Sequence, residues 1–308
     1  MTSPFGTLHV LADASAGDGR VSAQLPVLER ALDESDLEHA VLLCKSPSEL
    51  TNAAREVLGA GGRYVVAVGD DASVHHVVNG MFQGGEPLIE DPVLGIVGAD
   101  TGCDLALSIG LPAGTEAAAR HLSGGNTYPF DVMKVTYTTG PDARETTYCH
   151  NLAEVGLGAQ VARRVNRLPA RLGRSRRFLG FWLELLGSRP AVVKVEADRK
   201  AFEGRAFNVV VANGQFTSGL RLSPKSFPGD GVLDALVFHG PRSEAYTMLP
   251  RMYQHGGHIP HPHIQELRAK VRVAVDADRP LPVVGDGLLL GTTPATFQII
   301  PQRLLLKL

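Results

Sequence analysis

The first 125 residues alternate two hydrophobic patterns, short apolar runs and segments whose apolar residues lie three and four positions apart. Short apolar runs bounded by turns are typical of buried strands, and the three-to-four spacing is typical of amphipathic helices. Apolar strands that alternate with helices favour a parallel sheet covered on both faces. We expect buried strands at 8–12, 39–44, 64–68 and 93–97, and helices at 24–32, 46–58 and 74–82.

The pattern changes after about residue 126, where apolar and polar positions alternate one by one. This period of two predicts strands with one face in a core, and the Gly and Pro turns between them favour an antiparallel β-sandwich. The fold class is therefore α/β plus β, with domains at 1–125 and 126–290 and a C-terminal segment, 291–308, that completes the fold. The expected strands are 132–138, 192–197, 271–276, 296–300 and 304–308, interrupted by a helical stretch at 160–186.

Composition narrows the class of protein. Apolar residues make up 44% of the chain, which is enough for a core, and the formal charge is −2, which argues against a protein held on nucleic acid by charge. No apolar run reaches the roughly 18 residues that a membrane span needs. The first residues lack a signal-peptide layout, and three cysteines suggest free thiols in a reducing compartment. We therefore expect a cytoplasmic protein.

Four motifs, in order along the chain, carry a resemblance to a known family. They are residues 66–80 (VAVGDDASVHHVVNG), 94–112, 213–234 and 284–288. The first resembles the pattern V-x-x-G-G-D-G-T-x-x-E-V-x-N-G of the diacylglycerol and sphingosine lipid kinase superfamily, and the others are similar to its later motifs. The resemblance implies an N-terminal domain that holds ATP, a C-terminal β-sandwich, and a lipid that enters between them.

The chain departs from this family pattern at the phosphate-binding positions. In the family, glycines there let backbone amides approach the nucleotide phosphates. Asp70, Ala72 and Asp100 replace such glycines, and Asp13 stands where the family has asparagine. Leu288 replaces the glutamate that serves the family as general base. A carboxylate about 4 Å from a phosphate costs on the order of 4 kcal/mol at an effective dielectric near 20, so these changes disfavour ordinary phosphoryl transfer.

The same two loops supply the candidate site, because they follow the carboxyl ends of neighbouring parallel strands. One interpretation is a new acid/base or metal site, and the other is a group of solvated acids with a helix N-cap. The resemblance also implies a structural Mg²⁺ at Asp230. The acid/base candidates are Asp70, Asp71, His76, Asp100 and Asp104, and the residues of the former nucleotide loops are Gly69, Ser73, Thr101, Gly102 and Cys103.

Residues 163–182 contain seven arginines and no acidic residue. Such a stretch could contact an anionic membrane peripherally, or it could be a solvated basic face. Pro169 and Gly173 interrupt it, so one continuous amphipathic helix is not expected.

Taken together, the sequence favours a lipid-kinase fold that has lost ordinary ATP phosphoryl transfer. We expect its interdomain cleft to take a hydrophobic or amphipathic small molecule, in a repurposed enzyme that needs no cofactor. One alternative is a non-catalytic lipid-binding or regulatory protein. The other is an active lipid kinase of the diacylglycerol type, and only that interpretation requires ATP and Mg²⁺. No nucleic-acid partner is expected.

Overall fold

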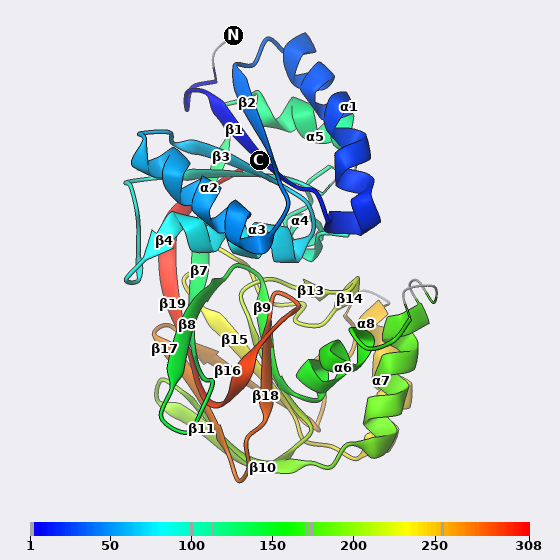
Figure 1. Ribbon diagram of the computed structural model, residues 1–308. Helices are drawn as coiled ribbons and strands as arrows, with labels where there is room; N and C mark the ends of the chain where they lie inside the picture. Colours follow the sequence, from blue (N-terminus) through cyan, green and yellow to red (C-terminus); the bar gives the residue numbers. More distant parts are fainter. Residues whose placement is uncertain (1–2, 99–101, 113, 170–171, 173–174, 254–255) are drawn as a thin grey trace.

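The computed structural model describes residues 3–98, 102–112, 114–169, 172, 175–253 and 256–308. Its N-terminal part is a parallel sheet in the order β2-β1-β3-β6, seen at the top of Figure 1. The strands are β1 (Leu8–Asp13), β2 (His39–Cys44), β3 (Tyr64–Val68) and β6 (Val93–Val97). The helices are α1 (Arg20–Glu34), α2 (Pro47–Gly59), α3 (Asp71–Met81), α4 (Asp104–Ser108) and α5 (Thr115–Leu122).

Helices cover both faces of this sheet, as the alternation of apolar runs predicts. On one face the apolar side chains of α2 and α3 pack against Leu11, Val65 and Ala67. On the other face α1 and α5 pack against Leu8, Val10 and Val66. Because every residue of β3 and β6 is buried, the central strands read as continuous hydrophobic runs in the sequence.

The C-terminal part is built of antiparallel strands around a second hydrophobic core, which confirms the expected combination of an α/β part and a β-sandwich. The last strand, β19 (Leu288–Lys307), pairs along its length with β7 (Thr127–Thr138), and its end pairs in parallel with β6. One sheet therefore runs through both parts. The remaining strands are β8 (Arg144–Cys149), β9 (Leu152–Gly156), β10 (Ala191–Ala197), β11 (Lys200–Ala206), β12 (Asn208–Ala212), β15 (Leu233–Phe238), β16 (Ile264–Ala269), β17 (Arg272–Ala277) and β18 (Pro282–Gly285), with short hairpins β4 (Phe82–Gln83)–β5 (Glu86–Pro87) and β13 (Phe216–Thr217)–β14 (Leu220–Arg221).

Three helices cover the outer side of strands β9, β12 and β15, at the right of the lower part of Figure 1. They are α6 (Leu157–Val165), α7 (Ser175–Gly187) and α8 (Ala245–Tyr253). The helical stretch expected at 160–186 is thus two helices, and Pro169 lies between them. Among the described residues, no helix is both long enough and apolar enough to cross a membrane.

Two expectations about strands were wrong in detail. Residues 39–44 form an edge strand rather than a buried one, and the side chains of Leu42 and Leu43 are 50% and 40% exposed. The apolar run alone cannot distinguish an edge strand from a central one. Segments 296–300 and 304–308 are not separate strands but parts of β19, whose pairing with β7 shifts register between Ile300 and Leu304.

Candidate functional site

The first loop consists of residues 69–70, between β3 and α3, and the first residues of α3, 71–73, and its polar groups are already paired with one another. Asp70 is the N-cap of α3, and its Oδ1 accepts from the amide and the hydroxyl of Ser73, both at 3.0 Å. Asp13, at the end of β1, places Oδ2 2.9 Å from the same hydroxyl. The two carboxylates thus converge on one serine at the positive end of a helix, where negative charge is stabilised.

Gly69 fits this loop because nothing larger would. A Cβ added at Gly69 would lie 2.2 Å from the Ser73 hydroxyl oxygen. His76, one turn along α3, is half-buried, and burial followed by the field of His75 lowers the pKa of its imidazole. The negative charges of Asp13 and Asp70 oppose this lowering of the pKa of His76. The structure therefore places the predicted residues Asp70 and His76 near Asp13.

Two further acids, Asp71 and Asp104, fix the described end of the second loop, residues 102–104, where α4 begins. The Asp71 carboxylate accepts from the amides of Asp104 at 2.7 Å and Leu105 at 3.1 Å, and the Cys103 thiol lies 3.7 Å from it. Asp104 in turn accepts from the amides of Ser218 and of Gly219 in the β13–β14 hairpin. Asp100 and Thr101 lie outside the described residues, and Gly102 borders the pocket described below.

Burial has the largest effect on the pKa values of Asp71, Cys103 and Asp104. It raises the pKa of Asp71, and the neighbouring Asp104 carboxylate adds to that rise. Burial also raises the pKa of Asp104 and of the Cys103 thiol, so the thiol stays protonated. Because both acids are paired with backbone amides, they link α3, α4 and the hairpin as a connector. Their catalytic roles stay a prediction.

A buried polar network that sequence reasoning missed joins the two parts of the molecule. Asp286, between β18 and β19, accepts from His75 Nδ1 at 2.9 Å and from the amides of His150 and Asn151 at 3.0 Å each. His75 Nε2 lies 3.0 Å from the Thr147 hydroxyl. Burial alone would raise the pKa of Asp286, but the fields and hydrogen bonds of His150 and His75 outweigh it and hold that pKa below the usual value. The only sequence signal was its place in the fourth motif.

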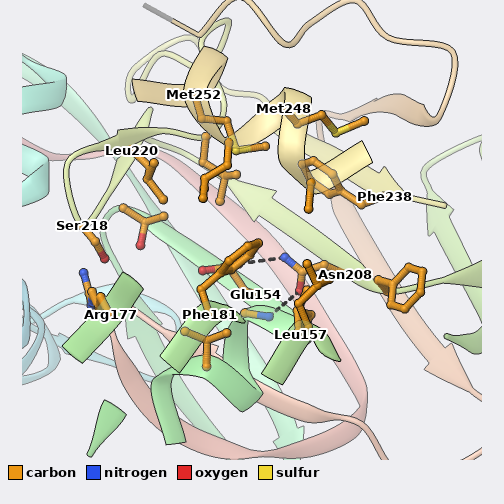
Figure 2. Close-up of a pocket in the computed structure, with 18 of the residues that line it drawn as sticks. Glu154, Leu157, Arg177, Phe181, Asn208, Ser218, Leu220, Phe238, Met248 and Met252 are labelled. Carbon is orange, nitrogen blue, oxygen red and sulfur yellow. Dashed lines mark hydrogen bonds between the residues drawn. The ribbon is translucent and has the colours of Figure 1, made fainter. Parts of the chain in front are cut away.

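A pocket of about 670 Å³ lies beneath α6, α7 and α8. Figure 2 shows Phe181, Leu157, Leu220, Met248 and Met252 among the apolar residues that line it, together with the carboxyl of Glu154. The expected location was the cleft between the two parts. In the structure the C-terminal part supplies most of the wall, and the N-terminal part contributes Gly102, Asp104 and Leu107 at one side. The connector residue Asp104 therefore borders this pocket.

Two donors from the protein already bind the carboxylate of Asp230, where a structural Mg²⁺ was expected. Arg268 donates to Asp230 Oδ2 at 3.1 Å, and the amide of Val232 donates to Oδ1 at 3.0 Å. Among the described residues, two clusters elsewhere could hold a metal ion, a buried one of His75, Cys149 and Asp286 and a partly exposed one of Glu244, His261 and His263. However, the amide of His263 donates to Nδ1 of His261, which leaves Nε2 of His261 as the protonated nitrogen that faces Glu244.

The resemblance to the kinase family implies that nucleotide phosphates would lie at the first loop. The Ser73 amide at the start of α3 is capped by Asp70, and two carboxylates occupy the space around the hydroxyl. A phosphate there would meet those charges instead of free amides.

The basic stretch 163–182 spans the end of α6 and most of α7. Arg164 pairs with Glu184 at 2.5 Å, and Arg176 donates to the carbonyl of Val165. Several apolar side chains of α7 are nevertheless exposed to solvent, namely Phe178, Leu179, Leu183 and Leu186. An exposed apolar face beside arginines is typical of peripheral membrane contact.

Comparisons with known proteins agree with this architecture. Residues 7–135 match the diacylglycerol kinase catalytic domain, and residues 151–307 match the YegS C-terminal NAD kinase beta sandwich-like domain. A diacylglycerol kinase of Bacillus subtilis (strain 168) is 27% identical over 94% of this chain and 92% of its own length. A probable lipid kinase YegS of Escherichia fergusonii is 25% identical over 68% of this chain and 72% of its own.

Solved structures show the same fold. A crystal structure of a putative diacylglycerol kinase from Bacillus anthracis str. Sterne aligns with a TM-score of 0.76 at 19% identity, covering 99% of this chain and 98% of that one. Yeast NADH kinase aligns with a TM-score of 0.53 at 9% identity, over 98% of this chain and 83% of that one.

Proposed function

Because this chain belongs to the diacylglycerol kinase family, with its catalytic-domain and YegS-type C-terminal models both matched, we propose that it binds an amphipathic lipid beneath α6, α7 and α8. We further propose that it does so without ordinary ATP-dependent phosphoryl transfer. We propose that a ligand held in that pocket is also the substrate on which the acidic residues of the two loops would act.

The observation that carries the lipid proposal is the pocket itself. Its volume of about 670 Å³ lies within the roughly 300–1,000 Å³ of small-molecule sites. Its walls are mainly leucine, methionine and phenylalanine side chains, and Figure 2 shows Arg177 and Ser218 together at one side. A mainly apolar wall with polar groups at one side suits a ligand that has a hydrocarbon body and a polar end.

The second half of the proposal rests on the first loop and on Leu288. Phosphoryl transfer depends on positioning the phosphates and on neutralising their charge. Here Asp13 and Asp70 add negative charge at the start of α3, and Asp70 already caps the helix. Leucine at position 288 cannot accept a proton, and a general base typically contributes a factor of about 10² to 10⁴ in rate. Asp286 does not replace it, because its low pKa and three hydrogen bonds make it a poor base.

We also propose that α7 lies on a membrane surface when the protein loads its ligand. The exposed Phe178 and Leu186 are on the same helix as Phe181, which lines the pocket. Arginines of the 163–182 stretch would meet anionic headgroups, each contributing about 1 kcal/mol near such a surface.

A lipid-binding measurement with two matched variants tests the main proposal. The purified protein is titrated against a fluorescent long-chain monoacylglycerol. Leu220→Trp fills the pocket and should reduce binding at least tenfold, whereas Leu42→Trp, on the exposed edge strand β2, should leave binding unchanged. Equal binding by all three proteins would contradict the pocket assignment.

A second candidate is an ATP- and Mg²⁺-dependent lipid kinase. It is favoured by the names of the curated relatives and by the intact Asp71–Asp104 connector between the loops. The test is transfer of radioactive phosphate from ATP to the bound lipid with Mg²⁺ present. We expect no transfer above a no-protein control. Transfer that disappears in Leu220→Trp but not in Leu42→Trp would establish the second candidate instead.

A further inference from the structure

Glu154 is a carboxyl in the wall of a mainly apolar pocket. It lies on β9 and lines the cavity together with Leu157, Phe181 and Leu220. Its Oε2 accepts one hydrogen bond, from Asn208 Nδ2 at 2.8 Å. Among the described residues, Oε1 has no hydrogen-bond partner, and it faces the cavity. A carboxyl enclosed in this way costs free energy unless its remaining oxygen finds a partner.

The surrounding backbone is shaped to hold this carboxyl in place. Asn208 Oδ1 accepts from the amide of Gly158 at 3.0 Å, which fixes the amide side chain so that its Nδ2 points to Glu154. A Cβ added at Gly158 would lie 1.9 Å from Glu154 Oε2. Glycine at 158, at the start of α6, therefore allows the carboxyl to rest against the helix while Oε1 stays open to the pocket. Figure 2 shows the hydrogen bond between Glu154 and Asn208 as a dashed line.

The charges around Glu154 do not supply the missing partner. Burial raises the pKa of Glu154, and the Asn208 hydrogen bond and the more distant Arg177 only oppose that rise. Asp104, Glu244 and His263 also line the pocket, but no hydrogen bond joins any of them to Glu154 within the described residues. The partner that Oε1 lacks must therefore come from the ligand or from water.

We propose that Glu154 determines which lipid the pocket accepts, by pairing Oε1 with a hydrogen-bond-donating group, a hydroxyl or an amine, carried by an amphipathic ligand. This inference rests on the proposed lipid-binding function. When the carboxyl is ionised, a ligand whose polar part can only accept, such as a simple ester, leaves Oε1 unpaired and is therefore not preferred. A site discriminates strongly against such ligands, because a buried polar group left without a partner costs free energy.

The test compares three probes of equal chain length, namely monooleoylglycerol with hydroxyls, oleylamine with an amine, and methyl oleate with only an ester. Dissociation constants are measured at neutral pH by displacement of a fluorescent fatty probe. The wild-type protein should prefer at least one donor-bearing probe over methyl oleate by on the order of tenfold, the range expected of one hydrogen bond to a charged group. Glu154→Leu should abolish this preference while keeping the binding of methyl oleate.

Two further variants separate the sources of the donor and guard against misfolding. Glu154→Gln keeps an acceptor but no charge, so it should retain the preference for monooleoylglycerol and lose that for oleylamine. Gly158→Ala should displace the carboxyl and weaken the preference with Glu154 still present. Glu203→Leu, an exposed change on β11, is the matched control and should behave as wild type. Circular dichroism confirms that each variant is folded.

The outcomes distinguish the two proposals. If the wild type binds none of the three probes, the lipid-binding function fails. If it binds all three with equal affinity, and Glu154→Leu changes nothing, lipid binding stands and the role of Glu154 is overturned.

Discussion

Replacing Asp286 with alanine should destabilise the protein more than any exposed acidic substitution. The change removes the acceptor of three buried donors, His75 Nδ1 and the amides of His150 and Asn151. Each buried donor left without a partner costs about 1–3 kcal/mol, and breaking a buried charge pair from one side costs about 3–5 kcal/mol. Because water can enter part of the gap, we expect a loss of roughly 3–5 kcal/mol in the free energy of unfolding. That is a large part of the roughly 5–15 kcal/mol that holds a typical fold.

The assay is urea denaturation at neutral pH, followed by circular dichroism and by the fluorescence of Trp182, which reports on α7. Asp286→Asn keeps one acceptor oxygen and should fall between wild type and Asp286→Ala. Asp142→Ala, in the exposed turn between β7 and β8, is the control and should change the free energy by less than about 0.5 kcal/mol. A loss below about 1 kcal/mol in Asp286→Ala would refute the hydrogen-bond reasoning.

The pH dependence of this stability difference tests the direction in which the pKa of Asp286 is shifted. The folded pKa of Asp286 is lowered, so its ionised form contributes stability above the pKa of an unfolded aspartate, about 3.9. That contribution is lost as the pH falls below this value and through the lower folded pKa. The stability gap between wild type and Asp286→Ala should therefore not shrink between neutral pH and about 4, and should shrink only at more acidic pH. A gap that shrinks already between pH 7 and 5 would contradict the assignment.

Two shorter predictions concern the connector and the membrane face. Asp71→Ala leaves the amides of Asp104 and Leu105 without their acceptor, so thermal unfolding should report a loss of about 1–3 kcal/mol; an unchanged melting temperature would argue against the connector role. Leu186→Ser, at a side chain that is 67% exposed, should reduce co-sedimentation with phosphatidylglycerol vesicles several-fold, whereas Leu42→Ser on β2 should not; equal sedimentation would exclude α7 as the contact.

Short-range features of this molecule follow directly from its sequence. The buried strands β3 and β6 and the helices beside them are encoded by local hydrophobic periods. One of the two interpretations of the acidic loops included a helix N-cap, and in the structure that cap is Asp70. The motifs also identified the family, because their glycines and acids sit at turns whose geometry is set within a few residues. Prediction failed first where local pattern is ambiguous, as in β2, whose apolar residues are half-exposed at a sheet edge.

Tertiary structure alone decided which polar groups meet. His75 and Asp286 are 211 residues apart, and Glu154 and Asn208 are 54 apart, so no local period links either pair. Glu154 occupies one position of a short strand, and nothing in its neighbours indicates that its face turns into a cavity rather than to solvent. The sequence determines the elements because their hydrogen bonds and apolar faces are local. The pocket, the Glu154 carboxyl in its wall and the contacts between the two parts arise only when distant elements pack, because each depends on atoms that lie far apart in the chain.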